Sequence, residues 1–299
     1  MKRMHTLLTL WFALSLAACG GSKNGAKTTA PPSGMLEIAG FAAPESALYV
    51  ADGDYYLISN VNGGPGDVDD NGFISKLGAD GKIIALRWID GAAADVTLSA
   101  PKGMGIRAGK LYVTDLDHVR VFDMATGKPA ATPEIALEGA TFLNDIAVQG
   151  DQLVVSDTGV DAKFAPTGAA AVWSIDSSDA PTKLIGGDLE GPNGVAISGG
   201  QVWVAPFGGK HLYRVDGEAR ADLTELGAGS LDGLVMLADG RILVSSWEAK
   251  GVFLGKAGGP FTQIVSDVGS PADIEVDVKR NRLVVPNMMG NSVRFYPLK

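Results

Sequence analysis

Six positions along the chain stand in the same local context and carry residue types from which a cation site can be built. Each precedes a short apolar alternation, as in Asn193-Gly194-Val195-Ala196. The six positions are Glu45, Lys102, Asn144, Asn193, Asp232 and Ala272. Two carboxylates and two amides among them would neutralise a divalent cation and leave room for water or substrate, since Ca²⁺ takes about six to eight oxygen ligands.

The type of donor atom narrows the choice of metal. No Cys or His belongs to the set, which disfavours Zn²⁺ and favours Ca²⁺. Another divalent cation that prefers oxygen ligands is the alternative. A second interpretation stays open at this point. Polar side chains that line a wet channel can equally bind water or neighbouring strands, without any metal.

The elements that must position these residues form a repeat. Short apolar strand patterns recur at a spacing of about 40 to 50 residues, which is the length of a propeller blade. The recurring segments are 55–59, 109–115, 151–157, 201–205, 241–245 and 282–286. One unit shows four strands joined by hairpin turns, at 194–197, 202–204, 211–215 and 221–226.

The last unit has three strands, and Leu36-Glu37-Ile38-Ala39 is the candidate for its missing outer strand. We therefore predict an all-β fold, a six-bladed β-propeller closed by an N-terminal outer strand. Inner strands of a propeller run along its axis, so the six aligned positions should meet at one end of the central channel.

Other residues should lie around the same channel mouth. Lys102 can receive an anionic group, and Phe207, Trp247 and Asn287 end second strands at this rim, where they would contact substrate; the two aromatic side chains can equally pack between blades. Long insertions at 60–72 and 158–170 should wall the site.

Three neighbouring features receive a structural interpretation. Asp145 and Asp273 follow aligned positions by one residue, so strand alternation should turn them away from the axis to bind adjacent blades; Asp273 can still turn inward because Ala272 has no donor. The segment 67–72 copies half of an EF-hand loop, but Gly78 replaces the closing Glu. We expect a turn there, with a second Ca²⁺ as the minor alternative.

The N-terminus has the layout of a secretory signal, with Lys2 and Arg3 ahead of an apolar run. Its Leu16-Ala17-Ala18-Cys19 end resembles the bacterial lipoprotein box, which implies lipidation at Cys19. The resulting division is a signal peptide at 1–18, a flexible tether at 19–34 and the propeller at 35–299. A lipidated chain would be anchored in the cell envelope, at the outer membrane or the periplasmic face.

Charge and cysteine content exclude several functions. The formal net charge is −9 with no basic patch, which argues against nucleic acid or an anionic bilayer surface as a partner; membrane attachment would occur through the lipidated N-terminus only. The single cysteine excludes an intramolecular disulfide.

The order and blade spacing of four motifs add a family resemblance. Pro44-Glu45-Ser46, Asn144-Asp145, Pro192-Asn193-Gly194 and Asp232-Gly233 resemble the senescence-marker-protein/gluconolactonase/luciferin-regenerating-enzyme-like family, and more distantly diisopropylfluorophosphatase and the paraoxonases. The resemblance implies that Glu45, Asn193 and Asp232 bind a divalent metal, that Asn144 ligates metal or holds substrate, and that Asp232 acts as base or nucleophile.

The chain also departs from these relatives. It has no clear counterpart of the arginine that grips sugar acids, and His118 and His211 are more typical of ordinary rim residues than of a catalytic pair. Two functions follow. The first is a Ca²⁺-dependent hydrolase of lactones or related esters in the cell envelope. The second is a non-catalytic, metal-stabilised propeller lipoprotein that binds a small ligand or a protein partner.

Overall fold

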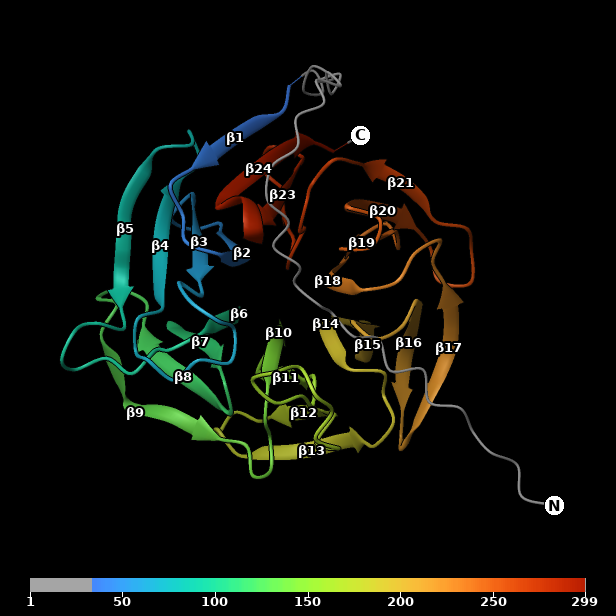
Figure 1. The fold of residues 1–299 in the computed structure, drawn as a ribbon, viewed down its shortest axis with the longest axis horizontal. Helices are drawn as coiled ribbons and strands as arrows, with labels where there is room; N and C mark the ends of the chain where they lie inside the picture. The colour runs from blue at the N-terminus through green and yellow to red at the C-terminus, as the bar shows by residue number, and fades with distance from the viewer. Residues whose placement is uncertain (1–33, 299) are drawn as a thin grey trace, which may run out of the picture. The chain divides into compact units, whose positions relative to one another are not determined.

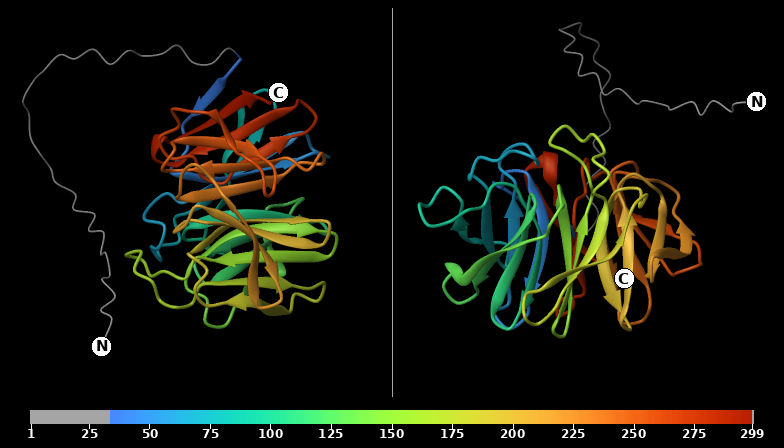
Figure 2. Two further views of the ribbon diagram at one scale, coloured as in Figure 1. Left: turned by 90° about the vertical axis from the view of Figure 1, so that its right-hand side faces the viewer. Right: turned by 90° about the horizontal axis from the view of Figure 1, so that it is seen from below.

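Six antiparallel, four-stranded sheets surround a central axis in the computed structural model, which describes residues 34–298 (Figure 1). The sheets are the blades of a propeller, and their inner strands run along its axis (Figure 2). The predicted six-bladed fold is therefore confirmed. Blades 1 to 5 are consecutive in the chain, and blade 6 combines the last three strands with the first one.

The strands occupy equivalent places in every blade. The innermost strands are β2 (Pro44–Val50), β6 (Pro101–Arg107), β10 (Leu143–Gln149), β14 (Pro192–Ser198), β18 (Leu231–Met236) and β22 (Glu275–Asp277). The second strands are β3 (Tyr55–Asn60), β7 (Lys110–Asp115), β11 (Gln152–Asp157), β15 (Gln201–Pro206), β19 (Ile242–Ser246) and β23 (Arg282–Asn287).

The outer half of each blade follows the same order. The third strands are β4 (Phe73–Gly78), β8 (His118–Asp123), β12 (Ala171–Ile175), β16 (His211–Asp216), β20 (Gly251–Gly255) and β24 (Ser292–Pro297). The outer strands are β5 (Ile83–Asp90), β9 (Pro129–Ala136), β13 (Pro181–Gly186), β17 (Ala219–Glu225), β21 (Thr262–Val265) and β1 (Leu36–Ala39). A short 3₁₀ helix, η1 (Met288–Gly290), follows β23.

The hydrophobic core lies between the blades. Second strands are buried on both faces, because a neighbouring blade covers each side, and so they have continuous apolar runs such as Leu111-Tyr112-Val113. Leu57 and Ile74 of blade 1, for example, share one apolar cluster with Met104 and Val113 of blade 2. This packing holds adjacent inner strands at a fixed distance around the channel.

The ring closes through β1, as the sequence predicted. Leu36 lies opposite Phe295 and Ala39 opposite Ser292, so β1 completes blade 6 as an antiparallel outer strand. The edge of β24 is thereby covered. The predicted signal peptide, Cys19 and all but the last residue of the predicted tether lie outside the described residues, and no helix within 34–298 is long and apolar enough to cross a membrane.

Candidate metal centre

Every inner strand of blades 1 to 5 carries a β-bulge at the same place, near its start. Pro44 pairs with Asn60 and Ala47 with Ile58, so β2 has one residue more than β3 over this stretch. The same shift occurs in β6, β10, β14 and β18. The bulge contains the aligned residue of each blade and the residue after it. Bulges re-aim side chains, and here they do so at equivalent points around the axis.

Neighbouring inner strands touch at these bulges. A Cβ on Gly194 would lie 2.1 Å from the backbone oxygen of Asp232, and one on Gly233 would lie 2.4 Å from the nitrogen of Ile274. Only glycine leaves room for this approach. The Asn-Gly and Asp-Gly motifs therefore serve close packing of the strands as well as supplying a polar side chain.

Hydroxyl groups on the second strands connect one bulge to the next. The Ser156 hydroxyl accepts a hydrogen bond from the nitrogen of Asp145 and donates to the carbonyl of Asn193 in the next blade, at 2.9 and 2.5 Å. Ser245 repeats this arrangement between Gly233 and Ala272. These hydroxyls fix the backbone of the aligned residues relative to each other.

Four of the aligned side chains each have one oxygen that is buried and lacks a hydrogen-bond partner. These oxygens are Glu45 Oε2, Asn144 Oδ1, Asn193 Oδ1 and Asp232 Oδ1. The four residues are at most 5% exposed. A buried polar atom without a partner costs about 1–3 kcal/mol, so four such oxygens on equivalent strands call for a partner from outside the chain. A divalent cation that prefers oxygen fits this donor set.

Hydrogen bonds to neighbouring side chains orient two of these four residues, Asn144 and Asp232. The Asn144 amide nitrogen donates to the Thr158 hydroxyl at 3.1 Å, which leaves the amide oxygen free. The indole nitrogen of Trp247 donates to Asp232 Oδ2 at 2.7 Å, which leaves Oδ1 free. In both residues the atom that remains without a partner is therefore an oxygen and not a donor group.

The buried carboxyl groups interact electrostatically. Burial, followed by the charge of Asp232, raises the pKa of Glu45 well above its usual value, and the nearby Lys102 opposes this. Burial raises the pKa of Asp232 to about 7, against a lowering by the Trp247 hydrogen bond. The described residues contain no cluster of three or more His, Cys, Asp or Glu side chains suited to a metal, because two of the four donors here are amides.

The other two aligned positions provide no oxygen. Ala272 is buried in a small apolar cluster with Val61, Ala100 and Met288. Lys102 is 1% exposed; its ammonium group donates to the carbonyl of Ala100 and lies 4.3 Å from the centre of the Phe142 ring. Burial lowers the pKa of Lys102 to about 8. The lysine thus compensates buried negative charge instead of lining the open mouth.

The predicted rim residues fall into two groups. Phe207 and Trp247 are half-buried, and their rings meet edge to face with centroids 5.9 Å apart. Asn287 is 6% exposed, and its side-chain oxygen accepts hydrogen bonds from the backbone and the hydroxyl of Ser270. That role matches Asp157, which ends β11 and binds the nitrogen of Phe142. Asn287 therefore braces the loop ahead of its own inner strand.

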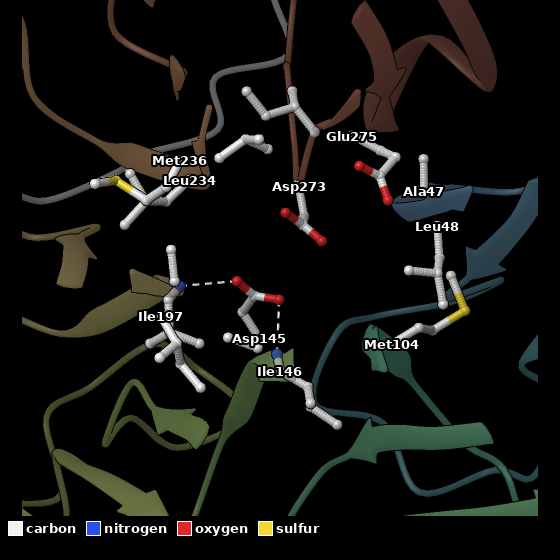
Figure 3. Close-up of a pocket in the computed structure, with 15 residues that line it drawn as sticks. Ala47, Leu48, Met104, Asp145, Ile146, Ile197, Leu234, Met236, Asp273 and Glu275 are labelled. Carbon is white, nitrogen blue, oxygen red and sulfur yellow. Dashed lines mark hydrogen bonds between the residues drawn. The ribbon is translucent and has the colours of Figure 1, made fainter. Parts of the chain in front are cut away.

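Asp145 does not turn away from the axis, so that part of the sequence prediction was wrong, whereas Asp273 turns inward, which is the alternative that the sequence left open. Their carboxylates, with that of Glu275, point into an open cavity of about 180 Å³ that is lined mainly by residues of the inner strands (Figure 3). For Asp145 the bulge is the cause, because it breaks the strict alternation of the strand. The predicted link between blades is nonetheless present, since Asp145 accepts from the nitrogen of Val195 and Asp273 from the Ser46 hydroxyl.

Sequence reasoning missed Glu275. Its carboxylate accepts from the nitrogens of Tyr49 and Val276, and burial raises its pKa to about 7. A signal was present, because Glu275 stands two residues after Asp273 and strand alternation places both on one face.

The two long insertions meet beside the mouth. A Cβ on Gly66 would lie 2.6 Å from Cα of Ala162, so the 60–72 and 158–170 loops are in contact. Both project from the same face of the propeller (Figure 2). The EF-hand-like segment is a turn-rich loop in which Asp69 binds Asn71 and Asp67 binds the nitrogen of Gly64.

Comparison with known proteins shows which molecules share this architecture. No family model matches the chain, and no curated protein does. Among solved structures, a gluconolactonase from Xanthomonas campestris superposes with a TM-score of 0.65 at 16% identity, covering 89% of either chain. The chain therefore shares the six-bladed propeller fold of that structure. A virginiamycin B lyase from Staphylococcus aureus also superposes, with a TM-score of 0.61 at 12% identity over 89% of this chain and 99% of that one. The propeller is thus common to gluconolactonases and to at least one other enzyme class.

Proposed function

We propose that the protein is a hydrolase of lactones or related esters that depends on a divalent cation, with Ca²⁺ as that cation. The observation that carries the proposal is the set of four buried, unpartnered oxygens contributed by blades 1, 3, 4 and 5. The fold shared with a structure described as a gluconolactonase adds support for the substrate class.

The residues that would hold the cation are Glu45, Asn144, Asn193 and Asp232. Their two carboxylates match the charge of a divalent ion, and oxygen is the donor that Ca²⁺ prefers. When bound, such a cation polarises a carbonyl oxygen and stabilises negative charge that develops on it.

Asp232 is the residue we assign as general base. The Trp247 indole holds Oδ2, so one lone pair of Oδ1 would bind the cation and the other would take a proton from a water molecule as the water oxygen attacks the carbonyl carbon. The ring C–O bond then breaks, and the same proton passes from Oδ1 to the departing alkoxide.

The deciding experiment combines metal binding with turnover. Metal-stripped protein is titrated with Ca²⁺ by calorimetry, and hydrolysis of a small lactone panel is followed in parallel. Asp232→Asn keeps an oxygen donor but removes the base, so it should retain weakened binding and lose turnover. Asp239→Asn, at an exposed position, is the matched control. Ca²⁺ binding without turnover in the parent protein would instead identify a non-catalytic scaffold, and no binding would rule out the metal site.

We further propose that the protein is exported and lipid-anchored in the cell envelope through Cys19. The Leu16-Ala17-Ala18-Cys19 segment supports this assignment. Metabolic labelling with a fatty-acid analogue should label the parent chain but not Cys19→Ala, and the variant should leave the membrane fraction. Membrane retention of an unlabelled Cys19→Ala chain would show that another element anchors it.

A further inference from the structure

Phe164 stands at the tip of the 158–170 loop in an unusual conformation. It is 56% exposed, and its φ of 60° lies in the left-handed region, which bulky side chains rarely adopt. The turn is held by Asp161, whose carboxylate accepts from the nitrogens of Lys163 and Ala165 and whose carbonyl accepts from the nitrogen of Phe164. The loop thus holds an aromatic ring in solvent at a cost in backbone energy.

Two aromatic contacts connect the side chain of Phe164 to Lys102, one of the six aligned residues. Phe164 packs on Phe142 with centroids 5.8 Å apart, and Phe142 covers the ammonium group of Lys102. Phe142 itself is 4% exposed and precedes β10, the strand that carries Asn144. A chain of contacts therefore runs from Lys102, whose ammonium group interacts with the charge of Glu45, to the exposed loop tip.

The tip is fixed in place by its surroundings. Ala162 packs against the 60–72 loop at Gly66, and the hydroxyls of Thr141 and Thr167 lie 3.1 Å apart. Phe164 is therefore presented by a loop that is braced at several points.

A second group of apolar side chains lies beside Asp232. Phe207 and Trp247 form a second aromatic pair, and Trp247 touches Asp232 directly. A buried apolar cluster of residues from blades 1, 2, 5 and 6 adjoins Trp247. It comprises Val61, Ala100, Ala272 and Met288, with Ala43, Leu116 and Trp247 at its margin.

We propose that Phe164 is a specificity-determining residue that receives an apolar alkyl or aryl group on the substrate of the metal centre. The inference rests on the proposed function for the site but assigns it a substrate class, an uncharged lactone or ester with an apolar substituent. Covering an exposed aromatic ring with apolar surface is favourable, and only a substrate with such a group provides it.

The test compares two lactones that share one ring, γ-butyrolactone and its derivative with a six-carbon alkyl chain. Phe164→Ala should lower kcat/KM for the alkyl lactone about tenfold, because a tenfold change corresponds to the burial of about two methylene groups. The kcat/KM for the unsubstituted lactone should change by less than about twofold. Phe164→Leu should keep most of the preference. Val68→Ala, on the adjoining loop, is the matched control for an exposed apolar residue.

Phe164→Gly separates this role from a structural one. Glycine tolerates the left-handed conformation, so the melting temperature should stay equal or rise while the alkyl preference is lost. A preference that survives in both Phe164→Gly and Phe164→Ala would overturn the proposal.

A binding measurement keeps the proposal distinct from the proposed function. The non-hydrolysable lactams of the same two rings are titrated into the protein in the presence of Ca²⁺. If the parent protein hydrolyses neither lactone, the proposed function fails, but tighter binding of the alkyl lactam that depends on Phe164 still supports this inference. Equal affinity for both lactams in the parent protein would overturn it.

Discussion

The indole nitrogen of Trp247 and the carboxylate of Asp232 form a hydrogen bond of 2.7 Å that occupies Oδ2 and leaves Oδ1 without a partner. One oxygen of the carboxylate is therefore held by the indole, and the other is left for a different partner. Trp247 thereby becomes a positioning residue in addition to a rim residue.

Trp247→Phe should keep the aromatic wall but release Asp232. We expect turnover to fall about tenfold, because a charge-assisted hydrogen bond contributes about 1.5–3 kcal/mol and part of it orients the base. The pKa that governs the acidic limb of the pH profile should rise, since the indole bond lowers the pKa of Asp232. Steady-state kinetics across pH measure both effects.

Trp173→Phe is the matched control, because the buried indole nitrogen of Trp173 has no hydrogen-bond partner. It should leave the pH profile unchanged. Identical profiles for Trp247→Phe and the parent protein would contradict the positioning role.

Metal-free protein should lose stability as the pH rises from about 4 to 7. Burial raises the pKa of both Asp232 and Glu275 to about 7, whereas unfolded carboxyl groups release their protons near pH 4. The folded state holds more protons across this window, so the free energy of unfolding falls with rising pH, by on the order of a few kcal/mol in total. Thermal unfolding with a chelator at pH 5 and pH 7.5 measures the change.

Ca²⁺ should reverse this loss at pH 7.5, where the carboxylates are free to bind it, by about 3 kcal/mol at a hundredfold excess over Kd. Glu275→Gln should flatten the pH dependence of the metal-free protein. A chelated protein that is more stable at pH 7.5 than at pH 5 would show that these groups are ionised without a cation.

Arg107 links blade 2 to blade 3, and its loss should destabilise the whole ring. Its guanidinium group is 5% exposed and donates to the carbonyls of Asp151 and Asp176 at 2.8 and 2.7 Å, and also to Asp179. Arg107→Ala removes these bonds, together with the one to the buried carbonyl of Ile175, and should cost about 2–3 kcal/mol. Chemical denaturation measures this cost, and Arg87→Ala, which removes a more exposed ion pair, should cost less than about 1 kcal/mol. Equal costs would contradict the role of the link.

Gly194→Ala should damage both stability and metal binding. The added methyl group would meet the Asp232 oxygen at 2.1 Å, so the inner strands of blades 4 and 5 must separate. We expect a loss of about 2–3 kcal/mol and at least a tenfold loss of Ca²⁺ affinity, by denaturation and calorimetry. Gly186→Ala has ordinary space and should be nearly neutral. Unchanged Ca²⁺ affinity in Gly194→Ala would show that strand spacing does not set the site.

The blade repeat and the aligned positions could be predicted from sequence because both follow from strand periodicity. Leu36–Ala39 was identified as the closing strand because the last unit lacked one. The direction of Asp145 was not predictable, since a bulge shifts alternation without any fixed sequence signature. The hydrogen bonds of Asn287 and the contact between Phe142 and Phe164 were not predictable either. Both involve loop residues, whose side-chain directions depend on tertiary packing and do not follow from strand periodicity.

The closure of blade 6 by β1 also means that the two described ends of the chain lie side by side, with Gly34 packed on Pro297. Because the ring is closed, the position of the chain ends does not determine how the blades are arranged. The same arrangement around the cation site should therefore form when the chain starts at a different blade. A circular permutant that joins these ends through a short linker and opens at the exposed Gly150 turn should therefore assemble the same four oxygens from a rearranged gene.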